Sequence, residues 1–137
     1  MSIARHIAIA FALLLGAALM TASAQQRESD DVFIPIGKYF SQGDTESLSA
    51  WFADDLEISI FTKTSTCSRS QAIRILKSFF ATHTPRSFEI THTASRGKTK
   101  YALGTLNAGG ELYLVTIFVG QKDNSYLIQQ LKIQTAP

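Results

Sequence analysis

His92 is the residue of this sequence that best fits acid–base chemistry. In a strand expected from about residue 87 to 94, it shares its alternation with Phe88 and Ile90, so we expect it on the face that packs against helices. A histidine in such a place can exchange protons near neutral pH. The alternative, which we favour, is a core histidine held by one hydrogen bond.

Three carboxylates form the second group of candidates: Asp54, Asp55 and Glu57. They lie where a second helix is expected to meet a first strand. If Asp54 or Asp55 came close to His92, the pair could abstract a proton. A turn at Asp54-Asp55 explains these residues equally well, because Asp stabilises turns through its side chain. We favour the turn.

Aromatic residues form the third group, since aromatic side chains with polar tips often line small apolar pockets. Together with His92, the predicted pocket residues are Tyr39, Trp51, Phe80 and Tyr101. Core packing is the alternative for all four, because they recur at helical or strand spacing.

The sequence contains no metal or cofactor motif. His83 and His92 are nine residues apart and form no H-x-x-x-H pair, and there is no C-x-x-C, P-loop, G-x-S-x-G or G-x-G-x-x-G. We therefore expect no metal and no cofactor. Cys67 is the single cysteine, which predicts a buried or loop thiol, with an intermolecular disulfide as a weaker alternative.

Three helices are expected to come early in the chain. The first is capped by Asp30 or Asp31 and ends at Gly43, and the second follows Asp44 with an apolar face of Leu48, Trp51 and Phe52. A short strand over 56–60 and a polar connection over 62–67 come next. Ser68 and Gln71 then have the spacing of a capping box, and the third helix ends before Pro85.

Four successive strands are expected after the helices, over about 87–94, 98–107, 111–120 and 125–135. Ala108-Gly109-Gly110 and Lys122-Asp123-Asn124 are the turn signals between the last three. The order α-α-β-α-β-β-β-β predicts an α+β fold with a curved, mostly antiparallel sheet.

The strand over 111–120 is apolar on both faces. One face carries Tyr113, Val115, Ile117 and Val119, and the other carries Leu112, Leu114 and Phe118. Helices can cover only one face of such a sheet. We therefore expect a second copy of the chain to cover the convex face, giving a homodimer.

Residues 1–24 have the three parts of a secretory signal peptide: Arg5 near the start, an apolar run from Ile7 to Met20, and Ala22-Ser23-Ala24. An uncleaved anchor is the alternative. The remaining 113 of the 137 residues suffice for one domain, 25–137. They carry 12 basic and 11 acidic side chains, which gives no argument for nucleic acid. We expect a periplasmic or secreted protein with no membrane segment after cleavage.

The element order resembles the nuclear-transport-factor-2-like superfamily, a cone of three helices packed into a curved sheet. The stretches Asp31-Val32-Phe33-Ile34-Pro35-Ile36, Gly43-Asp44 and Leu48-Ser49-Ala50-Trp51-Phe52 also resemble a family of small secreted bacterial proteins of unknown function. The resemblance implies a pocket between the helices and the concave sheet face, and it carries no catalytic signature. Our first hypothesis is a non-enzymatic binding or assembly module. The alternative is a small enzyme of the isomerase or lyase type that uses His92 as its acid–base group.

Overall fold

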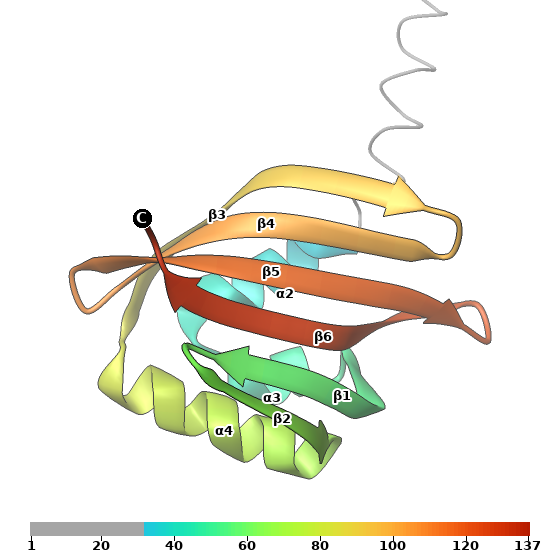
Figure 1. Cartoon of the computed structure of the whole chain (residues 1–137), viewed down its shortest axis with the longest axis horizontal. Helices are drawn as coiled ribbons and strands as arrows, with labels where there is room; N and C mark the ends of the chain where they lie inside the picture. The colour runs from blue at the N-terminus through green and yellow to red at the C-terminus, as the bar shows by residue number, and fades with distance from the viewer. Residues whose placement is uncertain (1–31) are drawn as a thin grey trace, which may run out of the picture. The chain divides into compact units, whose positions relative to one another are not determined.

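The computed structural model describes residues 32–137, so the signal-peptide segment 1–24 and the expected caps Asp30 and Asp31 lie outside the described residues. Within residues 32–137 the elements are α2 (Phe33–Gln42), α3 (Thr45–Ser49), β1 (Phe52–Ile60), β2 (Lys63–Ser68), α4 (Arg69–Thr82), β3 (Pro85–Arg96), β4 (Thr99–Ala108), β5 (Glu111–Lys122) and β6 (Ser125–Thr135) (Figure 1).

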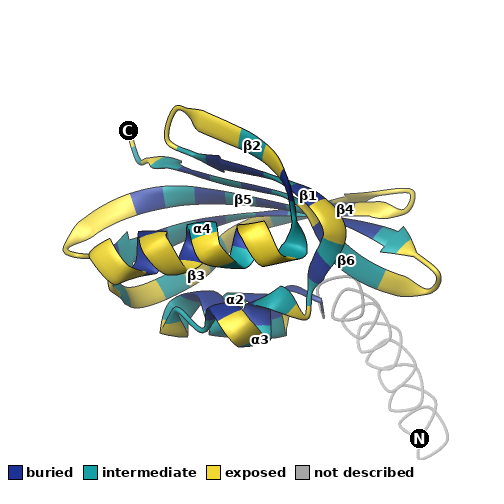
Figure 2. Ribbon diagram, turned by 90° about the horizontal axis from the view of Figure 1, so that it is seen from below, coloured by how far each residue is buried: buried dark blue, intermediate teal, exposed yellow. Residues whose placement is uncertain are grey.

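The six strands form one sheet in the order β2-β1-β6-β5-β4-β3. Neighbouring strands are antiparallel except for β1 and β6, which run parallel. The helices lie on one face of the sheet, with α2 packed on β3 and α4 on β1 and β2 (Figures 1 and 2). The predicted α+β architecture is confirmed.

Local signals fix most of the helix ends. Gly43 ends α2 with φ of 63°, and Asp44 caps α3 by accepting from the Ser47 backbone N–H at 3.2 Å. The Ser47 bonds to this carboxylate also lower the pKa of Asp44. The capping box at the start of α4 is present, with Gln71 N–H donating to Ser68 Oγ and Ser68 N–H donating to Gln71 Oε1.

The core lies between the helices and the inner sheet face, the face toward the helices. Along β5 the predicted set Tyr113, Val115, Ile117 and Val119 is buried. A series of aromatic contacts crosses the core: the Phe40 ring stacks on Phe88 at 5.1 Å and meets Phe80 edge-on at 5.8 Å. These contacts join α2, β3 and α4 in one packed unit.

Two expectations for the first half of the chain are wrong. Residues 63–68 form strand β2 and not a polar connection, because they pair with β1 at the sheet edge, where polar side chains can face water. The second helix ends at Ser49, so Phe52, Asp54 and Asp55 belong to β1 and not to a helix and turn. Pairing with β6 decides this, since Ile128 N–H donates to the Trp51 carbonyl and Phe52 pairs with Ile128.

The strand pairings within residues 32–137 contain four register shifts, and two of them decide the faces of residues discussed below. In β3 the shift lies between Ile90 and His92, and in β6 it falls opposite Phe118 and Val119, which pair with Gln130 and Ile128. Each leaves one extra residue, Thr91 in β3 and Gln129 in β6, and reverses the face of the residues beyond it. Strict alternation from Leu131 and Ile133 would put Leu127 on the inner face, but Ile128 is the residue that is fully buried with them.

Gly104 makes room for the Phe88 ring on the inner face. A Cβ at Gly104 would collide with Phe88 Cζ, would lie 2.6 Å from Cε2, and would lie 3.1 Å from the Glu89 carbonyl oxygen. We expect Gly104→Ala to lower the free energy of unfolding by about 1–3 kcal/mol. Urea denaturation followed by Trp51 fluorescence measures this change.

Gly37→Ala is the matched control for Gly104→Ala. Gly37 lies inside α2, and its Cβ would meet Ile90 Cδ1 at 3.5 Å, an ordinary contact. We expect this variant to raise the free energy of unfolding by about 0.5–1 kcal/mol, because alanine has the higher helix propensity. Equal effects of the two substitutions would contradict the packing role of Gly104.

Candidate functional site

A cavity of about 490 Å³ lies between α4 and the β1–β2 hairpin. Figure 1 shows α4 running beside β2 at this end of the sheet. The hairpin contributes Ile58, Ile60, Lys63 and Ser65 from its strands and Phe61 from its turn. The helix side contributes Arg74, Ile75, Ser78, Phe79, Thr82 and His83. Such a volume is within the range of small-molecule sites.

The cavity has an apolar floor and a polar rim. Ile58 is buried on the inner face of β1, and Phe79 is buried on α4. Lys63 and Ser65 lie on β2, the edge strand, across from Ile60 and Ile58. Arg74 and Ser78 lie one turn apart on α4 and are exposed. The sheet edge therefore leaves one side of the apolar floor open to water.

His83 lines the cavity at the C-terminal end of α4. Its ring stacks on Phe79 with centroids 4.3 Å apart and planes 9° apart. Nδ1 lies 3.0 Å from the Phe79 carbonyl oxygen and 2.8 Å from Thr82 Oγ1. The Phe79 carbonyl oxygen also accepts from the His83 backbone N–H at 2.9 Å. These contacts hold the ring in one orientation.

Phe61 and Tyr113 complete the aromatic cluster around His83. The Phe61 ring lies 6.0 Å from His83 and 5.9 Å from Tyr113, and Tyr113 meets His83 edge-on at 5.5 Å. The Tyr113 hydroxyl donates to Glu111 Oε2 at 3.3 Å. Burial and then the Glu111 charge raise the pKa of Tyr113, so the hydroxyl stays a donor at neutral pH.

Phe61 has a positive φ of 56° and is 41% exposed. Bulky side chains rarely adopt this backbone conformation, which costs about 1–2 kcal/mol. The hairpin turn and a backbone hydrogen bond from Phe61 N–H to the Ile133 carbonyl, 2.8 Å long, hold it there. The strained residue thus presents an aromatic ring at the cavity wall.

His92 does not face the helices, which corrects the orientation expected from the sequence. The register shift after Ile90 pairs His92 with Leu103, on the outer sheet face, and leaves His92 exposed. Its ring lies 5.9 Å from Tyr101, a second outer-face residue. A strict alternation through Phe88 and Ile90 fails here because Thr91 is the extra residue of a β-bulge.

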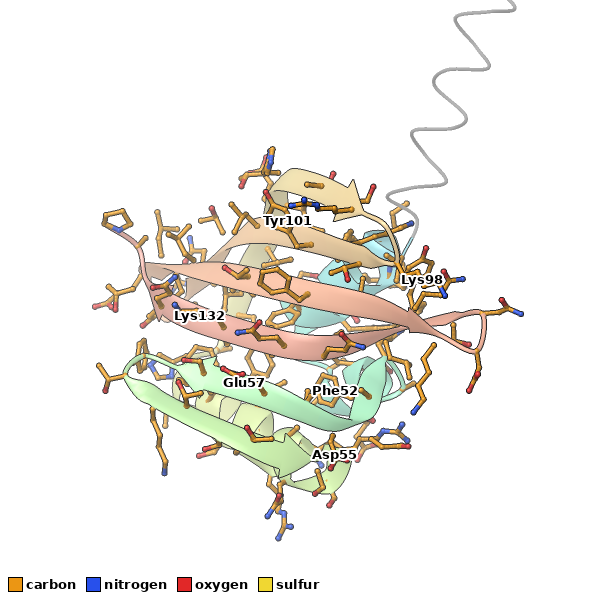
Figure 3. The ribbon with its side chains drawn as sticks, turned by 45° about the vertical axis from the view of Figure 1, so that its right-hand side comes forward. Phe52, Asp55, Glu57, Lys98, Tyr101 and Lys132 are labelled. Carbon is orange, nitrogen blue, oxygen red and sulfur yellow. The ribbon has the colours of Figure 1, made fainter. Side chains whose placement is uncertain are left out.

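The structure does not bring His92 together with the predicted carboxylates. His92 is on β3 and Asp54 and Asp55 are on β1, with β4, β5 and β6 between these strands. Four inter-strand spacings amount to about 19 Å. Asp54 instead forms an ion pair with Arg69 at 3.0 Å, and Glu57 accepts from Gln130 at 3.5 Å. Figure 3 shows Asp55 and Tyr101 toward opposite edges of the sheet.

None of the five predicted pocket residues lines the cavity beside α4. Tyr39 and Trp51 are half-buried against the core, and Tyr101 lies on the outer face with its ring 5.7 Å from Phe118. Phe80 is buried, and it borders a second, more open depression of about 390 Å³ near Asp44 and Lys77.

Cys67 is buried on β2 opposite Leu56, in agreement with the expectation of a buried thiol. Burial and then the charge of Asp55 raise the pKa of this thiol, which disfavours the reactive thiolate. Among residues 32–137, no cluster of His, Cys, Asp and Glu is suited to hold a metal ion. No helix in this same range is long and apolar enough to span a membrane.

Two patterns in the sequence point to the elements that form the cavity. Phe79 and His83 are four residues apart in the third predicted helix, which places both on one face. The alternating threonines of 62–67 were a further sign, because β-branched residues favour strands. These signs concern one helix face and one strand separately, and only the folded sheet brings the two elements together at the cavity.

Residues 33–134 match the model of the family described as "Domain of unknown function (DUF4783)". A crystal structure of a DUF4783 family protein from Bacteroides ovatus is 21% identical, with a TM-score of 0.73, covering 76% of this chain and 94% of that one. No curated protein matches the chain.

Two nuclear-transport-factor-2-like proteins have the same fold. One, of unknown function from Shewanella baltica, is 10% identical with a TM-score of 0.63 and covers 83% of this chain and 96% of that one. The other, named as a candidate dehydratase from Streptomyces avermitilis, is 14% identical with a TM-score of 0.62 and covers 84% and 99%. The fold expected from the resemblance is confirmed, and at these identities the likeness concerns the fold alone.

The two described histidines should respond differently to truncation. His83→Ala removes a stacked ring and the hydrogen bonds of Nδ1, so we expect the free energy of unfolding to fall by about 1–2 kcal/mol. His92→Ala removes an exposed ring, and we expect a change of at most about 0.5 kcal/mol. Chemical denaturation of both variants checks this, and a larger loss for His92→Ala would contradict the assigned faces.

Proposed function

The chain belongs to the DUF4783 family, and from this premise we propose that it is an exported, non-enzymatic binding and assembly module. Its binding site is the cavity between α4 and the β1–β2 hairpin, and its ligand is a small molecule with an apolar body. Residues 1–24, with their basic start, apolar run and A-x-A end, support export to the periplasm or the exterior.

The observation that carries the binding proposal is the apolar floor of an open cavity. The cavity has a volume of about 490 Å³. Its apolar lining consists of three isoleucines and two aromatic rings: Ile58, Ile60, Ile75, Phe61 and Phe79. When a ligand with an apolar body displaces water from these side chains, the free energy of the system falls, which favours binding. The strained backbone of Phe61 adds support, since strain of this kind gathers at ligand sites.

The cavity offers little for acid–base catalysis. Among the described residues that line it, none is Asp or Glu, so His83 has no carboxylate partner there. The alternative function, an isomerase or lyase with His92 as acid–base and Asp54 or Asp55 assisting, needs those groups within hydrogen-bond reach. His92 lies on β3, and Asp54 and Asp55 lie on β1, with three strands between them. This separation favours the binding module over the enzyme.

The assembly proposal concerns the outer sheet face, the face away from the helices. His92, Tyr101 and Phe118 form a row of ring contacts across β3, β4 and β5. Leu112 on β5 is 52% exposed, and Leu103 and Leu114 are half-buried. Figure 3 shows this face, with Tyr101, Glu57 and Lys132 on it. A second copy covering the apolar part would remove it from water.

A neutral fluorescent probe tests the binding site. N-phenyl-1-naphthylamine should bind the wild-type protein with increased emission. Ser78→Phe should fill the cavity from α4 and weaken binding at least about tenfold, a loss of 1.4 kcal/mol. Ala81→Phe, an exposed position on the same helix outside this cavity, is the control. Equal binding by both variants would place the probe elsewhere and overturn the proposed site.

Light scattering tests the homodimer. The wild-type chain without residues 1–24 should show twice the monomer mass at micromolar concentration. Phe118→Lys places a charge in the centre of the outer apolar face and should give a monomer, because an unpaired charge is costly to bury. Ala81→Lys adds the same charge on α4 and should leave the dimer intact. A wild-type monomer at these concentrations would refute the assembly proposal.

A further inference from the structure

The polar rim of the cavity carries charge of one sign. Lys63 on β2 and Arg74 on α4 line opposite walls. Among the lining residues that the structure describes, no carboxylate balances them. The ion pairs found within residues 32–137 use other cations, Arg69 with Asp54 and Lys77 with Glu46. Two cations without an acidic partner thus flank an apolar floor.

The position of the two cations makes them available to a ligand. Both are exposed, and each side chain is long enough to lie along apolar surface while its charged end reaches the rim. Ser65 and Ser78 also line the cavity and add hydroxyl donors. Arginine matches the two oxygens of a carboxylate with two parallel N–H groups, and lysine adds a second positive charge.

We propose that the ligand is an amphipathic monocarboxylate, with its apolar chain on the floor formed by Ile58, Ile60 and Phe79 and its carboxylate between Lys63 and Arg74. The inference rests on the proposed binding function and adds the chemical class of the ligand. The same cavity disfavours a cationic amphiphile, because Lys63 and Arg74 would repel its head group. It also favours a carboxylate over a neutral alcohol of equal chain length.

The source of this preference is electrostatic, so it depends on salt. Exposed charges attract each other more weakly as ionic strength rises, because the Debye length falls from about 10 Å at 0.1 M to 3 Å at 1 M. The apolar contribution does not weaken in this way. The advantage of a carboxylate over an alcohol should therefore shrink in concentrated salt, while the affinity for the alcohol persists.

Three ligands with the same ten-carbon chain test the inference: decanoate, 1-decanol and decyltrimethylammonium, each titrated below its micelle concentration against the wild-type protein by calorimetry. We expect decanoate to bind about tenfold more tightly than decanol and the ammonium compound to bind most weakly. In 1 M sodium chloride the difference between decanoate and decanol should fall severalfold.

Charge-removing variants locate the effect. Arg74→Gln and Lys63→Gln should each raise the dissociation constant of decanoate about fivefold and leave that of decanol unchanged. Lys77→Gln, on the same helix but outside this cavity, removes an equal charge and should change neither. All three positions are exposed, so each variant should fold as the wild type does.

The outcomes separate the two levels of the proposal. If decanol binds as tightly as decanoate, or the ammonium compound binds most tightly, the carboxylate preference is refuted while the apolar site stands. If Lys77→Gln weakens decanoate as much as Arg74→Gln, the preference reflects net charge and not this cavity, and the inference also fails. If none of the three ligands binds, the proposed binding function fails with it.

Discussion

The fully buried Phe40 ring is the contact on which the rest of the domain depends. It stacks on Phe88 of β3 and meets Phe80 of α4 edge-on, so one side chain of α2 joins the sheet to the other long helix. Gly104 permits this arrangement, because any side chain there would occupy the place of the Phe88 ring. The packing of Phe40 on Phe88 therefore depends on the space that the missing Cβ of Gly104 leaves on β4.

The same aromatic contacts continue toward the candidate site. Phe80 meets Phe79, Phe79 stacks on His83, and His83 contacts Phe61 and Tyr113. The inner part of this series is buried, while Phe61 at its end is 41% exposed. Exposure of the rings thus increases from the core toward the cavity. The cavity lies between α4 and the β1–β2 hairpin, where side chains do not fill the space between helix and sheet.

The two faces of the sheet differ in the kind of partner that they suit. The inner face ends in a cavity with an apolar floor and a cationic rim, which suits a small ligand. The outer face presents Tyr101, Phe118 and Leu112 over a wide area, which suits a flat partner surface. Because the register of β3 turns His92 outward, the most promising catalytic residue of the sequence belongs to the outer face.

The sequence by itself determined the four closing strands, their turns at Gly109-Gly110 and Asp123-Asn124, the capping box at Ser68, and the α+β class, because alternation, turn residues and caps are local signals. Only the tertiary structure decided the faces of His92 and Ile128, the pairing of residues 63–68 with β1, and the cavity between α4 and the hairpin. A bulge places one extra residue in one of two strands that stay paired, and an edge strand gains its ladder hydrogen bonds only from its neighbour. Neither constraint is local, so no window of the sequence contains it.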